Sequence, residues 1–269
     1  MTVKLSGINI YPVKGLGGIA LDESDTTPRG LRYDRRFMVV DRDHEFVSQR
    51  EIPKMATVWT ELLGSQLEIA AADQESVCVD IEPRSIPTRS VRVWASQVPA
   101  HTVSAEADAW LSEYLGLDVH LVYMPENAER LCNPEYAKNN EIVSFADGFP
   151  FLVTNEASLD DLNQKIAAGG GAAVPMNRFR SNLVVSGASA WAEDGWDEIT
   201  IGGAVFRAAK PCARCQVTTT DQATGEVRGP EPLKTLSTFR DTDKGILFGV
   251  NLVPVKHGTV RVGDMVTFS

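Results

Sequence analysis

AKPCARCQVTTT, residues 209–220, is the stretch that separates the possible fold classes of this chain. Its two cysteines, Cys212 and Cys215, stand three positions apart, with Arg214 directly before the second. A thioredoxin-like CxxC motif opens a helix early in a βαβ unit, whereas this pair leads into the β-branched run of residues 215–220, which predicts a strand. The stretch therefore favours a fold built mainly from strands.

The two thiols of this stretch suggest metal or redox chemistry. A thiolate binds zinc, copper(I), iron–sulfur clusters and other soft or high-valent metals, and a cation at Arg214 favours the thiolate of Cys215. Zinc needs two further ligands, yet Cys78 and Cys132 lie alone in distant segments and the four histidines show no paired spacing. The motif alone leaves three interpretations open, namely a cofactor-binding or reactive Cys215, a redox or zinc-binding pair, and two ordinary core residues.

Composition limits the class of protein. The chain has 269 residues, 43% of them hydrophobic and 23% charged, which is ordinary for a globular protein of one large or two modest domains. Its net charge of −10 argues against a broad surface for nucleic acid or anionic lipid. It has no apolar run of membrane-spanning length and no signal-peptide pattern, and its four cysteines suggest a reducing compartment, so we expect a cytoplasmic protein without a membrane span.

Short strands separated by turns dominate the first part of the sequence. Alternating or apolar runs at 7–13, 36–40, 67–70 and 90–94 are bounded by polar, glycine or proline turns. Residues 105–115 predict a helix, because their apolar side chains recur at helical spacing. Frequent short strands favour a barrel or a sandwich over a parallel sheet.

A polar segment at 125–140 marks the expected domain boundary, which divides the chain into 1–124 and 125–269. In the second half, Thr154 or Asn155 can N-cap a helix that ends at three consecutive glycines, residues 169–171. Further strands are expected at 181–186, 197–208, 215–220, 246–253 and 259–268.

Basic residues recur at the ends of the predicted strands. Lys14 precedes Gly15 in a glycine turn, where a ligand can approach the backbone closely and lysine can pair with a phosphate. Paired arginines stand at 35–36 and again within 178–180. Because side chains alternate along a strand, one arginine of each pair should face inward and the other solvent.

Eight short motifs in fixed order give the chain a family resemblance over nearly its whole length. It resembles the MOSC family in its two-domain form, with an N-terminal β-barrel, as in the mitochondrial amidoxime-reducing component and its bacterial counterparts. The resemblance implies a mostly β, α+β fold, with an N-terminal β-barrel-like domain packed against a C-terminal MOSC β-barrel domain with a few helices. The motifs are YPVKG at 11–15, GL at 30–31 running to RF at 36–37, FADGFP at 145–150, NEASL at 155–159, RFRSN at 178–182, EDGWD at 193–197, CARC at 212–215 and GTVRVGD at 258–264.

This resemblance implies a molybdenum cofactor, a molybdopterin whose dithiolene and a protein cysteine both ligate the metal. By motif position the ligand is Cys215 and not Cys212, and Asp147 lies in the loop that approaches the metal, as a candidate for proton handling. Gly15, Gly148 and Phe149 stand where relatives can carry hydroxyl residues, so only backbone contacts carry over. The cofactor-binding positions implied in this way are Lys14, Gly15, Arg36, Gly148, Phe149, Arg180, Asn182, Ala213, Arg214 and Cys215.

The activity implied is the reduction of small N-hydroxylated compounds, such as amidoximes, hydroxylamines and N-hydroxylated base analogues. No four-cysteine ferredoxin segment is present in the sequence, so the resemblance implies a separate electron-donor protein, a flavin reductase or a ferredoxin-like iron–sulfur protein. MOSC domains also occur in proteins that sulfurate the molybdenum cofactor. The alternative is therefore a sulfur-carrier or cofactor-handling module in which Cys215 holds a persulfide.

Overall fold

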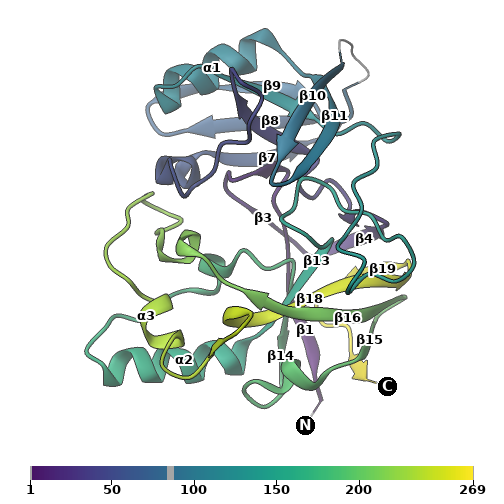
Figure 1. Cartoon of the computed structure of the whole chain (residues 1–269), viewed down its shortest axis with the longest axis vertical. Coiled ribbons are helices and arrows are strands. Elements are labelled where there is room, and N and C mark those ends of the chain that lie inside the picture. Colours follow the sequence, from purple (N-terminus) through teal and green to yellow (C-terminus); the bar gives the residue numbers. More distant parts are fainter. Residues whose placement is uncertain (1, 84–87, 269) are drawn as a thin grey trace.

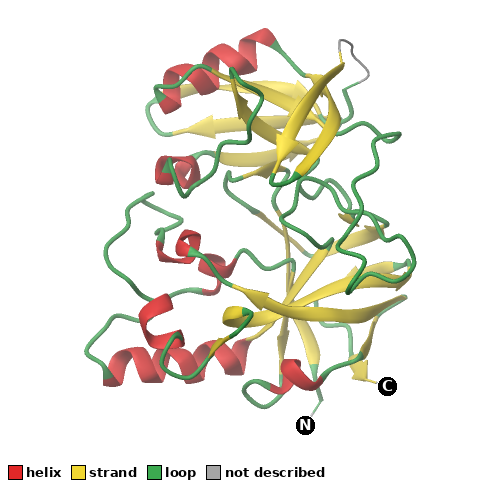
Figure 2. Ribbon diagram, in the orientation of Figure 1, coloured by secondary structure: helices red, strands yellow, loops and turns green. Residues whose placement is uncertain are grey.

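The computed structural model describes residues 2–83 and 88–268. The described chain forms two lobes that meet at mid-height (Figure 1), and strands make up most of both (Figure 2). This arrangement confirms the expected mostly β fold with a few helices. None of the described helices is both long enough and apolar enough to cross a membrane.

The N-terminal lobe is built from two antiparallel sheets and one long helix. A five-stranded sheet has the order β10-β11-β12-β6-β2, with only β2 and β6 parallel, and a three-stranded sheet has the order β7-β8-β9. These elements are β2 (Val13–Lys14), β6 (Phe37–Asp41), η1 (Pro53–Thr57), β7 (Trp59–Leu63), β8 (Gln66–Ala71), β9 (Gln74–Asp80), β10 (Thr88–Val93), β11 (Ser96–Thr102), α1 (Ala105–Leu115) and β12 (Val119–Tyr123).

The C-terminal lobe is built around a nine-stranded sheet. Its order is β20-β15-β16-β18-β13-β14-β1-β3, with β17 paired to β18. The parallel pair β13–β14 is joined through α2, as a parallel connection requires. The elements are β1 (Lys4–Ile10), β3 (Ile19–Leu21), β13 (Phe151–Asn155), α2 (Glu156–Ala168), η2 (Met176–Phe179), β14 (Leu183–Ser186), η3 (Ala192–Gly195), β15 (Glu198–Ile201), β16 (Ala204–Ala213), η4 (Gln216–Thr219), α3 (Leu233–Leu236), β17 (Asp241–Thr242), β18 (Gly245–Lys256) and β20 (Val266–Phe268).

The first strands of the chain lie in the C-terminal lobe. Strand β1 pairs with β14 and β3, and a separate three-stranded sheet joins β4 (Glu23–Thr27) to β5 (Gly30–Leu31) and β19 (Thr259–Arg261). The apolar side chains of β1 belong to the core of the C-terminal lobe, with those of β13 and β18. The two lobes are thus connected by early strands as well as by the polar segment at 125–140, and the division at residue 124 stays a prediction.

Local caps explain why both predicted helices form where expected. The Ser104 hydroxyl accepts hydrogen bonds from the backbone of Glu106 and Ala107, and Gly116, with φ of 67°, ends α1. In α2 the Asn155 side chain accepts from the Ala157 N–H, and the helix ends at Gly169. The residues that make these capping contacts lie close together in the sequence, so the sequence alone can indicate them. Both helix predictions are confirmed.

The predicted strand at 215–220 is wrong. Cys215 has extended backbone angles, but Gln216–Thr219 form the 3-10 helix η4. The hydroxyls of Thr218 and Thr219 donate to the carbonyls of Cys215 and Gln216. These local bonds offer the backbone an alternative to a sheet ladder, so the strand of this region, β16, precedes the second cysteine instead of following it.

Candidate functional site

A cavity of about 300 Å³ is lined by residues from both halves of the chain. The N-terminal half contributes the end of β2, Arg35 before β6, the segment around Ser48 and the β10–β11 turn at Trp94. The C-terminal half contributes the loop at 146–149, the end of η2 and the last residues of β16. Of the predicted site residues, all except Arg36 line it: Lys14, Gly15, Asp147, Gly148, Phe149, Arg180, Asn182, Ala213, Arg214 and Cys215.

The charge of the cavity is opposite to that of the whole chain. Asp147 is the single carboxylate among its described lining residues, although the chain carries a net charge of −10. A concave wall of one sign concentrates ligands of the other sign. The cavity is therefore suited to an anionic ligand. Its six basic side chains are Lys14, Arg35, Arg50, Arg180, Lys210 and Arg214.

Lys14 and Asp147 form an ion pair across the two halves of the chain. Lys14 Nζ lies 2.5 Å from Asp147 Oδ1, and Trp94 Nε1 donates to the same oxygen at 3.2 Å. The enclosed position alone would raise the pKa of Asp147, but the Lys14 cation holds it below its usual range. Burial lowers the pKa of the Lys14 ammonium in spite of its partner. Because the Asp147 side chain is 73% exposed to the cavity, solvent screens this pair.

Two arginines stack on one tyrosine ring beside this pair. The guanidinium carbons of Arg35 and Arg180 lie 4.3 Å and 4.2 Å from the centre of the Tyr11 ring. Both arginines have left-handed backbones, with φ of 48° and 52°, a conformation that non-glycine residues seldom adopt away from functional sites. Arg35 is paired with the buried Asp34 carboxylate at 2.7 Å.

Among the residues that the structure describes, no carboxylate contacts the Arg180 guanidinium directly. The guanidinium donates to the Leu16 carbonyl at 2.7 Å and to the Gln222 side-chain oxygen at 3.1 Å. Burial, more than the neighbouring charges, lowers its pKa to about 10. An anion in the cavity would supply the missing negative partner.

Arg36, which the family resemblance assigned to the cofactor, lies outside the cavity. Its guanidinium donates to the Glu126 carboxylate at 2.7 Å and to the Met124 carbonyl at 2.6 Å. The preceding residue, Arg35, turns into the cavity instead. The expectation that one arginine of the pair faces inward holds, but the inward one is Arg35.

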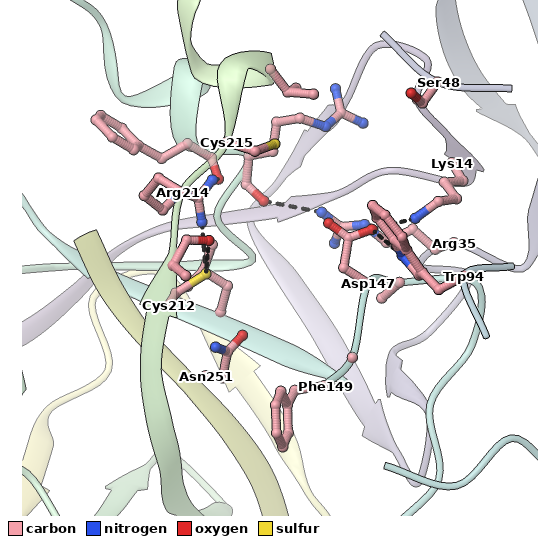
Figure 3. Close-up of a pocket in the computed structure, with 18 of the residues that line it drawn as sticks. Lys14, Arg35, Ser48, Trp94, Asp147, Phe149, Cys212, Arg214, Cys215 and Asn251 are labelled. Carbon is pink, nitrogen blue, oxygen red and sulfur yellow. Dashed lines mark hydrogen bonds and ion pairs between the residues drawn. The ribbon is translucent and has the colours of Figure 1, made fainter. Parts of the chain in front are cut away.

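Cys212 and Cys215 both line the cavity, and Figure 3 shows them with Arg214, across from Lys14, Arg35 and Trp94. Arg214 Nη1 lies 2.9 Å from the sulfur of Cys212, and its Nη2 donates to the Phe179 carbonyl. The cation expected beside Cys215 thus contacts Cys212, because the chain turns into η4 after the second cysteine. Cys215 is exposed to the cavity and accessible to a ligand.

The remaining predicted residues contribute backbone groups to the cavity wall or orient other side chains. Gly15 has φ of 87°, a left-handed conformation that favours glycine, and a Cβ there would displace the flexible end of the Met55 side chain. Nothing lies within 4 Å of a Cβ at Gly148, where the backbone is open to a ligand. The Asn182 side chain accepts hydrogen bonds from the Leu152 N–H and from Arg35 Nη1, and therefore orients that arginine.

Sequence reasoning missed several residues of the cavity wall. Arg50 and Trp94 stack, with the guanidinium carbon 4.3 Å from the ring centre, and Asn251 lies in the middle of β18. Only Asn251 gave a signal in the sequence, as a polar residue inside an otherwise apolar strand. Arg50 and Trp94 lie in turns, and the directions of their side chains depend on how these turns pack in the folded lobe.

The donor set fits an anionic cofactor that carries its own metal ligands. In the part of the chain that the structure describes, no three His, Cys, Asp or Glu side chains come together to hold a metal ion. Burial raises the pKa of the Cys132 thiol to about 12, which makes it a poor metal ligand at neutral pH. One accessible thiol among cations can anchor a metal only if further ligands arrive with it. In addition, the buried Arg214 Nε has no hydrogen-bond partner among the described residues.

Comparison with known proteins agrees with this organisation. The model of the MOSC domain matches residues 140–267, and that of the MOSC N-terminal beta barrel domain matches residues 2–118. Mitochondrial amidoxime-reducing component 1 of Mus musculus is 31% identical over 96% of this chain and 79% of its own length. The Homo sapiens protein of the same name is 30% identical over 96% and 80%. Molybdenum cofactor sulfurase of Solanum lycopersicum is 28% identical over 97% of this chain, which spans 35% of that protein.

Proposed function

Because this chain belongs to the MOSC family, in the form with an N-terminal MOSC β-barrel domain, we propose that it is a molybdenum-cofactor-dependent reductase of small N-hydroxylated compounds. Amidoximes, hydroxylamines and N-hydroxylated base analogues are the substrate class. The single observation that carries the proposal is the cavity in which an exposed thiol, Cys215, faces cations from both halves of an acidic chain. Relatives named amidoxime-reducing components support the same reading.

Different residues of the cavity would bind different parts of the cofactor. Cys215 would ligate the metal, and Lys14, Arg35 and Arg180 would hold the phosphate and the pterin. Backbone N–H groups at Gly15 and at Gly148, where no atom lies within 4 Å of a Cβ position, would complete the cradle. When bound, the molybdenum cofactor supplies two-electron reduction of an N–O bond, and the protein supplies orientation and charge.

Asp147 and Lys14 serve proton handling as a pair. The lowered pKa of Asp147 keeps it ionised at neutral pH, so it is a weak base whose charge holds the Lys14 ammonium in place. The lowered pKa of Lys14 makes its ammonium a better proton donor than an ordinary lysine. Reduction of an N-hydroxyl group to an amine and water consumes two electrons and two protons. The electrons come from a separate donor protein, a flavin reductase or a ferredoxin-like iron–sulfur protein.

Replacement of the proposed ligand tests this function. Cys215→Ala should abolish reduction of benzamidoxime and lower the molybdenum content, while the circular dichroism spectrum stays that of the parent and the melting temperature equals that of the cofactor-free parent. Cys78→Ala is the matched control, because Cys78 is exposed on β9 away from the cavity. Cofactor-loaded Cys215→Ala protein that reduced benzamidoxime at the parent rate would refute the ligand assignment.

A second function is favoured by one observation, the accessibility of Cys215 in a chain similar to a protein named molybdenum cofactor sulfurase. In this alternative Cys215 carries a persulfide and passes its outer sulfur to the cofactor. Elemental analysis and sulfane-sulfur assay of protein from a cofactor-competent host separate the two. A reductase contains about one molybdenum per chain and a pterin that fluoresces after oxidation, whereas a carrier contains labile sulfur without stoichiometric metal.

A further inference from the structure

The cavity has a second side that the proposed cofactor contacts leave unused. Figure 3 shows Lys14, Arg35, Asp147 and Trp94 together on one side, whereas Phe149 and Asn251 lie on the other. Lys14 and Arg35, which suit a phosphate, lie on the first side, whereas Arg214 lies across from them beside Cys212. Ligand pockets usually combine an apolar wall with a few polar groups that fix orientation, and the second side has both.

Irregular pairing of two strands shapes this second side. Asn251 on β18 pairs with Lys210 on β16, and the register shifts between Ala208 and Lys210 and again between Pro211 and Ala213. Bulges next to active sites redirect side chains. Here they leave Lys210, Cys212 and Asn251 all facing the cavity.

Asn251 presents an amide to the cavity from a strand whose opposite face is buried in the core. It lies between Val250 and Leu252, which are buried in the core of the C-terminal lobe. Its side-chain nitrogen makes only a long contact, 3.5 Å, to the Lys210 carbonyl. Among the described residues its side-chain oxygen has no hydrogen-bond partner. Such an amide offers donors and an acceptor to a ligand.

Phe149 supplies an apolar face beside this amide. Its ring is half-buried, packs against the cluster that contains Val253, and meets Tyr136 edge-on at 6.3 Å between centroids. Val253 lies two residues after Asn251 on β18 and hence on the same face of that strand. The Phe149 ring and the Asn251 amide are therefore both positioned by strand β18, one through its contact with Val253 and the other as part of the strand.

From this arrangement we infer that Phe149 and Asn251 form the substrate subsite and select planar aryl compounds that carry the N-hydroxylated group. This inference rests on the proposed function. The aryl ring packs on Phe149, and the amide of Asn251 pairs with the N–H and nitrogen atoms of an amidoxime, which has both a donor and an acceptor. Phe149 then determines ring preference, whereas Asn251 recognises the group common to all substrates.

A pair of substrates separates the two contributions. Phe149→Ala should raise the KM for benzamidoxime about tenfold and change that for acetamidoxime less than twofold, since only the first has a ring. Phe149→Leu, which keeps most of the volume, should raise the KM for benzamidoxime by a smaller factor. Asn251→Ala should lower kcat/KM for both substrates by a similar factor, about fivefold to tenfold. Phe239→Ala, an exposed ring outside the cavity, is the control.

Equilibrium binding gives an independent readout. Without an electron donor the cofactor-loaded protein does not turn over, so a calorimetric titration with benzamidoxime measures its Kd directly. The Kd should rise about tenfold in Phe149→Ala and stay unchanged in Phe239→Ala. Phe149 variants that affect both substrates equally, or neither, overturn the inference. A parent protein that reduces neither substrate but binds benzamidoxime through Phe149 instead refutes the reductase function alone.

Discussion

At the scale of single residues, the two arginines on Tyr11 differ in the partner that neutralises them. Arg35 has the buried carboxylate of Asp34, whereas Arg180 has only a carbonyl and an amide oxygen. A half-buried cation without a counter-charge is costly, and a bound anion relieves that cost. Arg180 is therefore the group from which an anionic cofactor gains most.

Replacement of Arg180 should weaken retention of the cofactor. Arg180→Gln is expected to reduce pterin content at limiting cofactor by a factor of about 10 to 100, the size of a charge-assisted hydrogen bond. The fluorescence of the oxidised pterin, per mole of protein, measures this loss. Arg36→Gln serves as the comparison because Arg36 pairs with Glu126 outside the cavity. Equal losses in the two variants would contradict the placement of these arginines.

The types of the site residues could be predicted from the sequence, but the directions in which their side chains point could not. The pair Arg35–Arg36 was recognised, yet the choice of the inward member depends on the left-handed backbone of Arg35. Likewise Arg214 was recognised, but its contact with Cys212 depends on the turn into η4. Both outcomes are decided by backbone angles that spacing alone does not fix.

At the scale of elements, the two long helices were predictable because their caps are local, whereas the extension of β16 to Ala213 and the helix η4 were not. The threonines at 218–219 have the β-branched side chains typical of a strand, but their hydroxyls bond to carbonyls three residues earlier. The bulges between β16 and β18 depend on pairing with a strand about forty residues later. Pairing partners at that distance leave no short-range pattern.

A buried carboxyl of η3, Glu193, is hydrogen-bonded to the start of α2 and should make stability depend on pH. The Glu193 carboxylate accepts hydrogen bonds from Ser158 and Asn155, and burial raises its pKa above the ordinary value of 4.5. Between those two pKa values the folded state binds more protons than the unfolded state. The free energy of unfolding therefore falls as the pH rises through this window.

Glu193→Gln should flatten that pH dependence, since the amide keeps the shape and cannot ionise. Urea unfolding of the parent and the variant between pH 4.5 and 8 measures the slopes. Glu61→Gln, at an exposed position of β7, should leave the parent slope unchanged. Parallel profiles for parent and Glu193→Gln would show that Glu193 is not the group responsible.

At the scale of the whole molecule, the candidate site is a joint product of two lobes with separate cores. One core gathers Phe37, Trp110 and other residues of the N-terminal lobe, and a second gathers Phe151, Phe206 and other residues of the C-terminal lobe. The sequence indicated two such units. It did not indicate that β1 and β4 join the second one, because their partners, β14 and β19, lie far along the chain.

A ligand that contacts both lobes should raise the stability of the molecule as a unit. A cofactor present at about 1,000 times its Kd adds about 4 kcal/mol, and about 1 kcal/mol moves the midpoint by roughly 2–4 °C in a chain of this size. We therefore expect calorimetry to show a melting temperature about 10 °C higher for cofactor-loaded than for cofactor-free protein. Arg180→Gln protein at the same cofactor concentration should show a smaller increase in melting temperature. Identical midpoints for loaded and cofactor-free parent protein would contradict binding across the lobes.

The pairing of β4 with β19 has a consequence for synthesis of the chain. Residues 23–25 pair with residues 259–261, so two segments that are synthesised far apart in time are neighbours. The N-terminal lobe can form its own sheets before β19 is made. During this interval β4 can pair only with β5, and its other edge stays open until residues 259–261 leave the ribosome.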